Sequence, residues 1–266
     1  MTTVGDECGD LFGQDAYSVR LDWGPTGAAA VCTDVVMVVD VLSFSTTVTV
    51  AVERGMRVFP FAWNDARAKD LATAQDAVVA VGRLEASKDD VATAPTLSPA
   101  GLLTGPVWPR VVMPSPNGAT IAGRLQDAGA TVAVGCLRNA SAAAGWLAAA
   151  LAAGQRVAVV AAGERWSDED SLRPALEDHL GAGAVIWALS GLVGDEGLSP
   201  EASAAADLFE ACRGRLAQMM QTCVGGRELA AKGFSADVAV AADLDASTVV
   251  PVLVDGAFSD HRSWRV

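Results

Sequence analysis

The sequence predicts an α/β protein in which helices cover both faces of a mixed, mostly parallel sheet. Short runs of β-branched residues alternate with helical stretches along the whole chain, which is the pattern of strand–helix–strand units. Asp34–Asp40 is a continuous apolar run of the kind found in strands that are buried on both faces. Hydrophobic residues make up 51% of the chain and charged residues 19%, so there is enough apolar material for a large core.

The first strand–helix–strand unit extends from Asp34 to Phe61. After the strand Asp34–Asp40, the segment Ser45–Arg54 contains Thr-Val-Thr-Val, which favours a strand. We nevertheless predict a helix, because Gly55 stands at its C′ position and Met56–Phe61 is the next strand. Two neighbouring parallel strands need a crossover connection, and a helix is the usual one.

The same alternation continues to the C-terminus. Ser98-Pro99 has the N-cap and N1 residues of a helix start, Gly129 and Gly154 each follow a helix, and Pro174 falls in the first turn of another. The predicted strands are Ala77–Val81, Val107–Met113, Thr131–Val134, Arg156–Ala162, Asp237–Ala241 and Val249–Val254, and the predicted helices are Asp65–Asp76, Gly118–Ala128, Asn139–Ala153, Leu172–Ser190, Pro200–Thr222 and Arg227–Lys232. Because no Pro-, Gly- or Ser-rich linker divides the chain, we expect residues 1–266 to form a single domain, with 1–16 as a loosely ordered tail.

Charge and cysteine content exclude several classes of protein. The chain has 19 basic and 32 acidic side chains, a formal charge of −13 and an isoelectric point near 4.5, which argues against nucleic-acid binding. Three acids and no basic residue stand in the first ten positions, unlike an export signal, and the longest uncharged runs are too short and too rich in Ala and Gly to span a membrane. The five cysteines are widely spaced without a C-x-x-C pair, which indicates reduced thiols in a cytoplasmic protein and no zinc site.

Polar side chains follow four of the predicted strands directly. In α/β sheets the active site lies where strands end and helices begin. The N–H groups of a helix start favour an anion such as phosphate there, and neighbouring carboxylates suit Mg²⁺, which would also supply a cation in this acidic protein. The four clusters are Asp40 with Ser43, Ser45, Thr46 and Thr47; Ser115–Gly118; Cys136–Asn139; and Gly163–Arg165 ahead of Glu177 and Asp178.

Each cluster also has a purely structural interpretation. Ser, Thr and Asn at helix starts are caps more often than ligands, and Asn117-Gly118 is a common turn dipeptide. Glu177 and Asp178 fall in the middle of a predicted helix, where adjacent acids usually face solvent. Their neighbours are small or apolar, however, so a buried carboxylate at this place would need a partner or a metal.

Taken together, the four clusters resemble the 2-phosphosulfolactate phosphatase family. The resemblance implies a three-layer α/β/α fold around a mixed sheet and the Mg²⁺-dependent hydrolysis of (R)-2-phospho-3-sulfolactate, a step of coenzyme M biosynthesis. Four places depart from the family pattern. Ser43 stands where the family has Arg, and Gly82-Arg83 stands where it has Gly-Glu. Leu97-Ser98-Pro99 replaces Asn-Ser-Pro, and Ser115–Ala119 replaces Thr-Thr-Asn-Gly-Thr. The matching segments, which cover nearly the whole chain in order, are Val35–Thr47, Ser115–Thr120, Gly135–Ala142, Ala161–Ile186 and Asp237–Gly256.

The clusters and the resemblance together give a set of candidate site residues. We expect Mg²⁺ and the helix-start N–H groups to neutralise the phosphoryl oxygens while a water attacks in line. Arg83, Arg138 or Arg165 would supply the cation that the missing Arg does not. The candidate catalytic residues are Asp40, Asn117 and Asn139; the candidate phosphate-binding residues are Ser43, Ser45, Thr46, Thr47, Gly118, Arg138 and Arg165; the candidate metal ligands are Asp40, Glu177 and Asp178.

The sequence leaves several alternatives open. The expected partner is a small phosphorylated acid, either 2-phosphosulfolactate or a related 2-phospho acid. A phosphatase for a different phosphorylated or sulfonated acid is one alternative, and a non-catalytic protein that kept an anion-binding loop is another. The Ala- and Gly-rich helices are suited to close packing either within the chain or across a homodimer.

Overall fold

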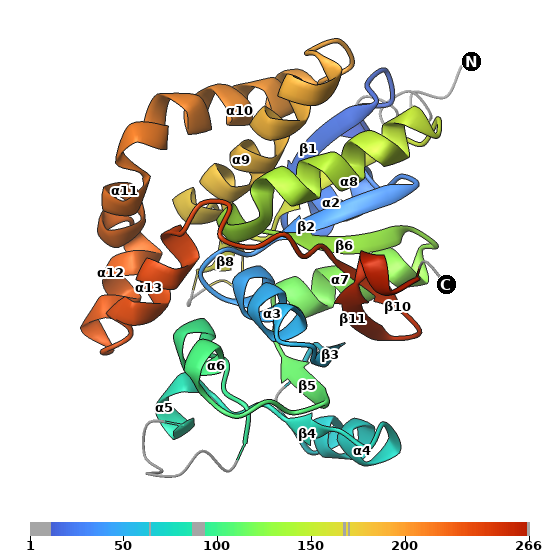
Figure 1. The fold of residues 1–266 in the computed structure, drawn as a ribbon. Coiled ribbons are helices and arrows are strands. Elements are labelled where there is room, and N and C mark those ends of the chain that lie inside the picture. Colours follow the sequence, from blue (N-terminus) through green and yellow to red (C-terminus); the bar gives the residue numbers. More distant parts are fainter. Residues whose placement is uncertain (1–11, 64, 87–93, 167–168, 170, 265–266) are drawn as a thin grey trace.

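The computed structural model describes residues 12–63, 65–86, 94–166, 169 and 171–264. Its centre is a nine-stranded sheet with helices on both faces (Figure 1), which confirms the predicted three-layer α/β/α fold. The strands, in their order across the sheet, are β1 (Val19–Trp23), β7 (Val157–Ala161), β2 (Val35–Val39), β6 (Thr131–Gly135), β10 (Pro251–Val254), β11 (Ala257–Asp260), β3 (Arg57–Phe61), β5 (Arg110–Pro114) and β4 (Val78–Val79).

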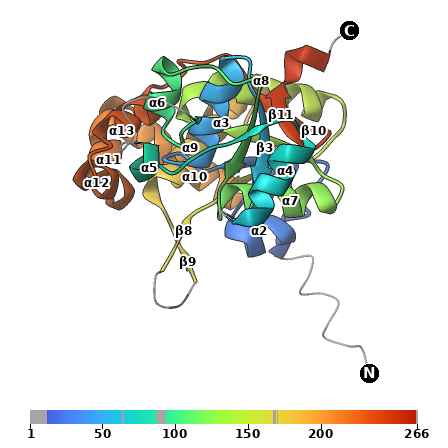
Figure 2. The same ribbon diagram turned by 90° about the horizontal axis from the view of Figure 1, so that it is seen from below.

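Helices fill most of the connections between these strands. The short strands β8 (Glu164–Arg165) and β9 (Leu172–Arg173) form a separate hairpin that projects from the body of the molecule (Figure 2). The helices of the described residues are α2 (Gly24–Ala30), α3 (Phe44–Glu53), α4 (Ala66–Ala74), α5 (Arg83–Ala86), α6 (Pro99–Thr104), α7 (Gly118–Asp127), α8 (Ala140–Ala152), α9 (Leu176–Val193), α10 (Pro200–Cys212), α11 (Leu216–Thr222), α12 (Val224–Ala231) and α13 (Ser235–Ala242), with short 3-10 turns at Leu137–Asn139, Arg213–Arg215 and His261–Trp264.

The sheet is mixed, as predicted, and the directions of its strands divide it into two groups. Strands β1, β7, β2 and β6 pair in parallel with one another, and so do β3, β5 and β4. Between the groups, β6, β10, β11 and β3 are joined by three successive antiparallel pairings. The second group therefore runs in the opposite direction to the first.

Strand β2 lies at the centre of the first group and is buried on both faces. Val35, Met37 and Val39 pack with helices α8, α9 and α10 in one apolar cluster. Val36 and Val38 point to the other face and pack with α3 and α7. This alternation explains why the strand is apolar at every position rather than at every second one.

One predicted strand, Asp237–Ala241, is wrong, because this segment is part of helix α13. Its Val-Ala-Val-Ala sequence has the composition of a strand. The buried residues, however, are Asp237, Val238 and Ala241, and this spacing matches one face of a helix rather than one face of a strand.

Two of the predicted helices have different limits in the structure. Leu172–Ser190 was expected to be continuous, but Leu172 and Arg173 belong to strand β9 and the helix begins only at Leu176. Pro174 explains the difference, since a residue before proline is pushed out of the helical conformation. The predicted helix Pro200–Thr222 is interrupted by a 3-10 turn at Arg213–Arg215, where Gly214 stands.

The N-terminal part of the chain contains a strand that sequence patterns did not indicate. Strand β1 includes Arg20, which is buried and forms an ion pair with Asp15 at 2.7 Å, so its sequence does not look apolar enough for a sheet. Gln14 is bonded through its side-chain amide to both the N–H and the C=O of Leu21. Residues 1–11 of the predicted loose tail lie outside the described residues.

The glycines of α9 allow this helix to pack closely within the chain. A Cβ atom at Gly183 would overlap the backbone oxygen of Ala205 in α10, and one at Gly181 would overlap the side chains of Val39 and Val41. The close approach of α9 to α10 and to the end of β2 thus requires glycine at both positions.

No helix in the described part of the chain combines the length and apolar character needed to cross a bilayer.

We predict opposite effects of alanine at two glycines of α9. Gly183→Ala should lower the free energy of unfolding by about 1–3 kcal/mol or more, because the backbone of Ala205 cannot move away easily. Gly191 lies on the same helix and has open space around it. Gly191→Ala should therefore raise the free energy of unfolding by up to about 1 kcal/mol, because alanine has the higher helix propensity. Denaturant unfolding of both variants measures this, and equal effects would contradict the packing of α9 described above.

Candidate functional site

Asp40 stands directly after β2, with its carboxylate between the first turns of two helices. Its Oδ1 accepts a hydrogen bond from the N–H of Phe44 in α3 at 3.1 Å, and its Oδ2 accepts one from the N–H of Gly118 in α7 at 3.2 Å. The residue is only 6% exposed. Its own N–H donates to Ser45 Oγ at 2.9 Å. Asp40 therefore serves as an N-terminal cap for α3 and as an anchor for α7.

Asp178 joins the ends of β2 and β7 from the first turn of α9. Its Oδ1 accepts a hydrogen bond from the N–H of Val41 at 2.7 Å, and its Oδ2 accepts one from the N–H of Gly163 at 2.9 Å. The acids at 177 and 178 were expected in the middle of a helix, but both lie at its start. Both are buried, with exposures of 3% and 4%, so neither lies on a solvated face.

Glu164 is a site residue that was not among the candidates. Its Oε2 accepts a hydrogen bond from Asn117 Nδ2 at 3.1 Å, and Asn117 Oδ1 in turn accepts one from Arg165 Nε at 3.4 Å. Glu164 lies three residues after β7, in the polar segment Gly163–Arg165 that follows this strand, and its place in that segment was the signal that could have identified it. The three residues line a cavity of about 320 Å³ together with Pro25, Thr26, Ile121, Arg124, Ala162, Ser171 and Leu172.

The carboxylates at this edge of the sheet make each other harder to ionise. Burial, and then the charge of Glu164, raises the pKa of Asp40 to about 7, although the N–H groups of Phe44 and Gly118 and the charge of Arg83 oppose this. Burial and the charge of Asp40 raise the pKa of Asp178 well above its ordinary value. Burial and the charge of Glu177 also raise the pKa of Glu164, with Arg173 opposing them. Burial is the largest cause in each case, and the repulsion among these acids adds to it, so a cation beside them would favour their ionised forms.

Glu177 belongs to the same cluster but faces α12. Burial, and then the charge of Glu177, raises the pKa of the Cys223 thiol to about 11. A Cβ atom at Gly225 would overlap Oε1 of Glu177. The glycine thus leaves room for this carboxylate beside the first turn of α12.

The hydroxyl groups around the start of α3 are used within the protein. Ser45 Oγ donates to the carbonyl of Val38 at 3.0 Å, Thr46 Oγ1 to that of Val41 at 2.6 Å, and Thr47 Oγ1 to that of Ser43 at 2.6 Å. Ser43 is the N-cap residue of α3, but its side chain makes no capping hydrogen bond. The bonds of Ser45, Thr46 and Thr47 fix the loop after Asp40, but they go to carbonyl groups and are not the helix caps that the structural interpretation expected.

Arg138 and Asn139, two further candidates, lie apart from the carboxylates. Asn139 is fully buried, and its amide donates to the carbonyl of Val249 at 2.9 Å and accepts from the N–H of Cys136 at 2.9 Å. Arg138 lies near Asp243, at 3.4 Å, and near Glu53, at 3.7 Å. Both side chains thus have structural partners among the described residues, and the structure does not bring them together with Asp40, Asp178 and Glu164.

A comparison with protein families shows to which family this chain belongs. A sequence model of the family described as 2-phosphosulpholactate phosphatase matches residues 26–256. The chain belongs to this family. The matched range contains every candidate site residue and the four buried or half-buried acids of the carboxylate cluster (Asp40, Glu164, Glu177 and Asp178). A search among curated proteins finds no match to the chain.

The family resemblance implies Mg²⁺. The acids of the carboxylate cluster suit this ion as part of its coordination, but not as a complete set of ligands. No group of three or more Asp, Glu, His or Cys side chains in the described ranges could hold a metal ion together. Mg²⁺, however, is commonly bound by one or two carboxylates, with water and substrate phosphate completing its coordination. The negative charge around Asp40 and Asp178 is favourable for such a cation, so these two residues fit the role of its protein ligands.

We predict that Asp40 makes the protein less stable as the pH rises through neutrality. Since the pKa of Asp40 is raised from 3.8 to about 7 on folding, its contribution to stability is complete below about pH 4 and is lost as the pH rises through about 7. Asp40→Asn removes this loss. Between pH 4 and pH 8 in the presence of a chelator, the stability of the variant relative to wild type should rise by on the order of 1–4 kcal/mol.

The pH dependence, rather than the absolute stability, is the test of this prediction. An asparagine cannot accept hydrogen bonds from the N–H groups of both Phe44 and Gly118, so the variant loses a bond at every pH. Urea unfolding at several pH values separates the two effects. Parallel stability curves for wild type and Asp40→Asn would contradict a raised pKa for this carboxyl group.

Proposed function

We propose that this protein is a Mg²⁺-dependent phosphatase that acts on a small phosphorylated acid, with 2-phosphosulfolactate as the first candidate substrate. The products would be the hydroxy acid and phosphate. The observation that carries the proposal is the carboxylate cluster at the ends of β2 and β7, beside the start of α7, in a chain of this phosphatase family. The thiols of Cys32, Cys136, Cys212 and Cys223 are free, which supports a reducing, cytoplasmic location.

The first turn of α7 supports phosphate binding. The N–H of Gly118 donates to Asp40, but those of Ala119 and Thr120 donate to no group in the described part of the chain. Free N–H groups at a helix start, together with the helix dipole, stabilise a phosphoryl group. The neighbouring cavity of about 320 Å³ lined by Asn117 and Glu164 leaves this helix start accessible to a small substrate.

The carboxylates supply the remaining chemistry. Burial raises the pKa of Asp40 to about 7, so a cation beside this carboxyl group would be needed to keep it fully ionised at neutral pH. Asp40 and Asp178 would hold Mg²⁺, and the ion, when bound, would offset their charge and polarise the phosphoryl oxygens. Asn117, which is bonded to Glu164 and to Arg165, would orient both side chains toward the substrate.

We predict that phosphate release from 2-phospho acids depends on Asp40, on Glu164 and on a divalent cation. Asp40→Asn and Glu164→Gln should each lower kcat/KM by about 100-fold or more, because each keeps the shape of the side chain but removes its charge. Asp34→Asn serves as the matched control. Asp34 is an exposed acid at the opposite end of β2, and its variant should keep wild-type activity.

A phosphate-release assay over a panel of small phosphoesters, with Mg²⁺ and with a chelator, tests this prediction. Circular dichroism of each variant shows whether it is folded. If folded wild-type protein binds inorganic phosphate but cleaves no member of the panel, the protein is a non-catalytic anion-binding member of the family. Activity that persists in the chelator would remove Mg²⁺ from the proposal.

A further inference from the structure

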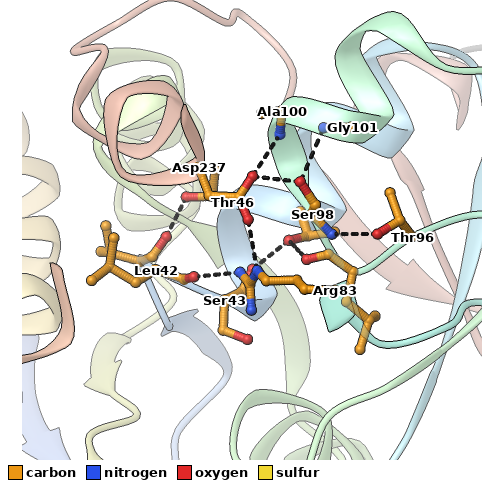
Figure 3. Close-up of polar contacts among 12 residues, drawn as sticks. Leu42, Ser43, Thr46, Arg83, Thr96, Ser98, Ala100, Gly101 and Asp237 are labelled. Atoms are coloured by element: carbon orange, nitrogen blue, oxygen red, sulfur yellow. Dashed lines mark hydrogen bonds and ion pairs between the residues drawn. The ribbon is translucent and has the colours of Figure 1, made fainter. Parts of the chain in front are cut away.

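Arg83 reaches the loop that follows Asp40 from a distant part of the sequence. Its Nη2 donates to the carbonyl of Leu42 at 2.7 Å, and its Nε forms an ion pair with Asp237 Oδ2 at 2.7 Å (Figure 3). Ser43 lies beside it in the same view. The guanidinium group therefore lies at the edge of the carboxylate cluster, where its charge acts on Asp40.

The position of Arg83 is fixed by a buried partner. Asp237 is 2% exposed, and its Oδ1 accepts hydrogen bonds from Ser98 Oγ at 2.5 Å and from the N–H of Ala100 at 3.2 Å (Figure 3). Both oxygens of this carboxylate are thus occupied. The network joins three segments, α5, α6 and α13, to the loop after β2, and it holds the guanidinium group in a single orientation.

The arrangement leaves part of the guanidinium group available to a ligand. A guanidinium carries five N–H donors, and Arg83 donates only to Asp237 and Leu42 among the described residues. The side chain is 15% exposed, so it is not sealed from solvent. A fixed, partly exposed arginine is well suited to hold a carboxylate or sulfonate through two parallel hydrogen bonds.

We propose that Arg83 binds an acid group of the substrate other than the phosphate, a carboxylate or a sulfonate, while the phosphoryl group lies at the Asp40 end of the site. This inference rests on the proposed function and adds to it the residue that selects the substrate class. A substrate that carries further acid groups besides its phosphate is repelled by the carboxylate cluster and by the formal charge of −13, so a fixed cation at the edge of the cluster offsets this repulsion.

Two other arginines compete with Arg83. Arg165 lines the cavity beside Asn117 and Glu164 and donates to Asn117, but it is exposed and belongs to the short hairpin of β8 and β9. Arg124 lines the same cavity, and its side chain has no hydrogen-bond or ion-pair partner in the described part of the chain. Its side chain is exposed, however, and nothing holds it in one orientation. Arg83 is already fixed by Asp237, so less conformational entropy is lost when it binds a ligand. The buried network therefore favours Arg83.

Two substrates that differ in one acid group test the inference. 2-Phospholactate carries a carboxylate where isopropyl phosphate carries a methyl group. Arg83→Gln should lower kcat/KM for 2-phospholactate by about 10- to 100-fold, the effect expected of a lost charged hydrogen bond, and change that for isopropyl phosphate less than about threefold. Arg83→Lys should restore part of the loss, since lysine keeps the charge but not the two-pronged geometry.

The controls separate binding of the acid group from a structural role. Arg67→Gln removes an exposed arginine of α4 that pairs with Asp65 and should leave both substrates unaffected. An equal loss for both substrates in Arg83→Gln would show a purely structural role. A loss specific for 2-phospholactate in Arg124→Gln, with none in Arg83→Gln, would place the acid group in the cavity beside Asn117.

A binding measurement separates failure of this inference from failure of the proposed function. Sulfolactate carries a sulfonate and a carboxylate but no phosphate, so it reports on the acid-binding position without catalysis. We expect it to raise the Tm of wild type and of Arg67→Gln, but not that of Arg83→Gln. If wild type cleaves neither phosphoester but shows this pattern, only the catalytic proposal fails. If sulfolactate stabilises wild type and Arg83→Gln equally, or neither, Arg83 does not bind the acid group.

Discussion

The burial of two carboxylates, Asp40 and Asp178, is the constraint on which the functional end of this fold depends. Each would be strongly unfavourable if it were left without partners. Each instead accepts two backbone N–H bonds from two different segments. The same bonds hold the starts of α3 and α7 against β2 and join the ends of β2 and β7. The residues that form the candidate site therefore also hold this edge of the sheet together.

The position of α9 follows from this constraint. Asp178 can reach the N–H groups of Val41 and Gly163 only if the first turn of α9 lies close to the end of β2. Gly181, one turn later, permits this because a side chain there would overlap Val39 and Val41. Gly183 permits the packing of α10 on the other side of the helix. Gly181 and Gly183 are therefore explained by contacts within the chain.

The sequence predicted the fold class well, because the alternation of strands and helices depends on local patterns. Apolar strands followed by polar residues identified Asp40, Asn117 and Gly118, and the packed surroundings of Asp178 indicated its burial. The pattern could not separate ligands from structural residues after a strand, so Asn139 and Arg138 were grouped with the site although their partners lie elsewhere. Nor could it find Asp237, because its alternating apolar neighbours concealed a helix and its partner Arg83 is remote in sequence.

The proposed chemistry needs a divalent cation beside the carboxylate cluster, at the ends of β2 and β7. A crystal structure with Mn²⁺ in place of Mg²⁺ and with inorganic phosphate, analysed by the anomalous signal of manganese, tests it most directly. We predict a single strong peak within about 2.0–2.3 Å of a carboxylate oxygen of Asp40 or Asp178, with phosphate at the start of α7. Phosphate bound at that place without a manganese peak, or manganese bound only elsewhere on this acidic protein, would contradict the account.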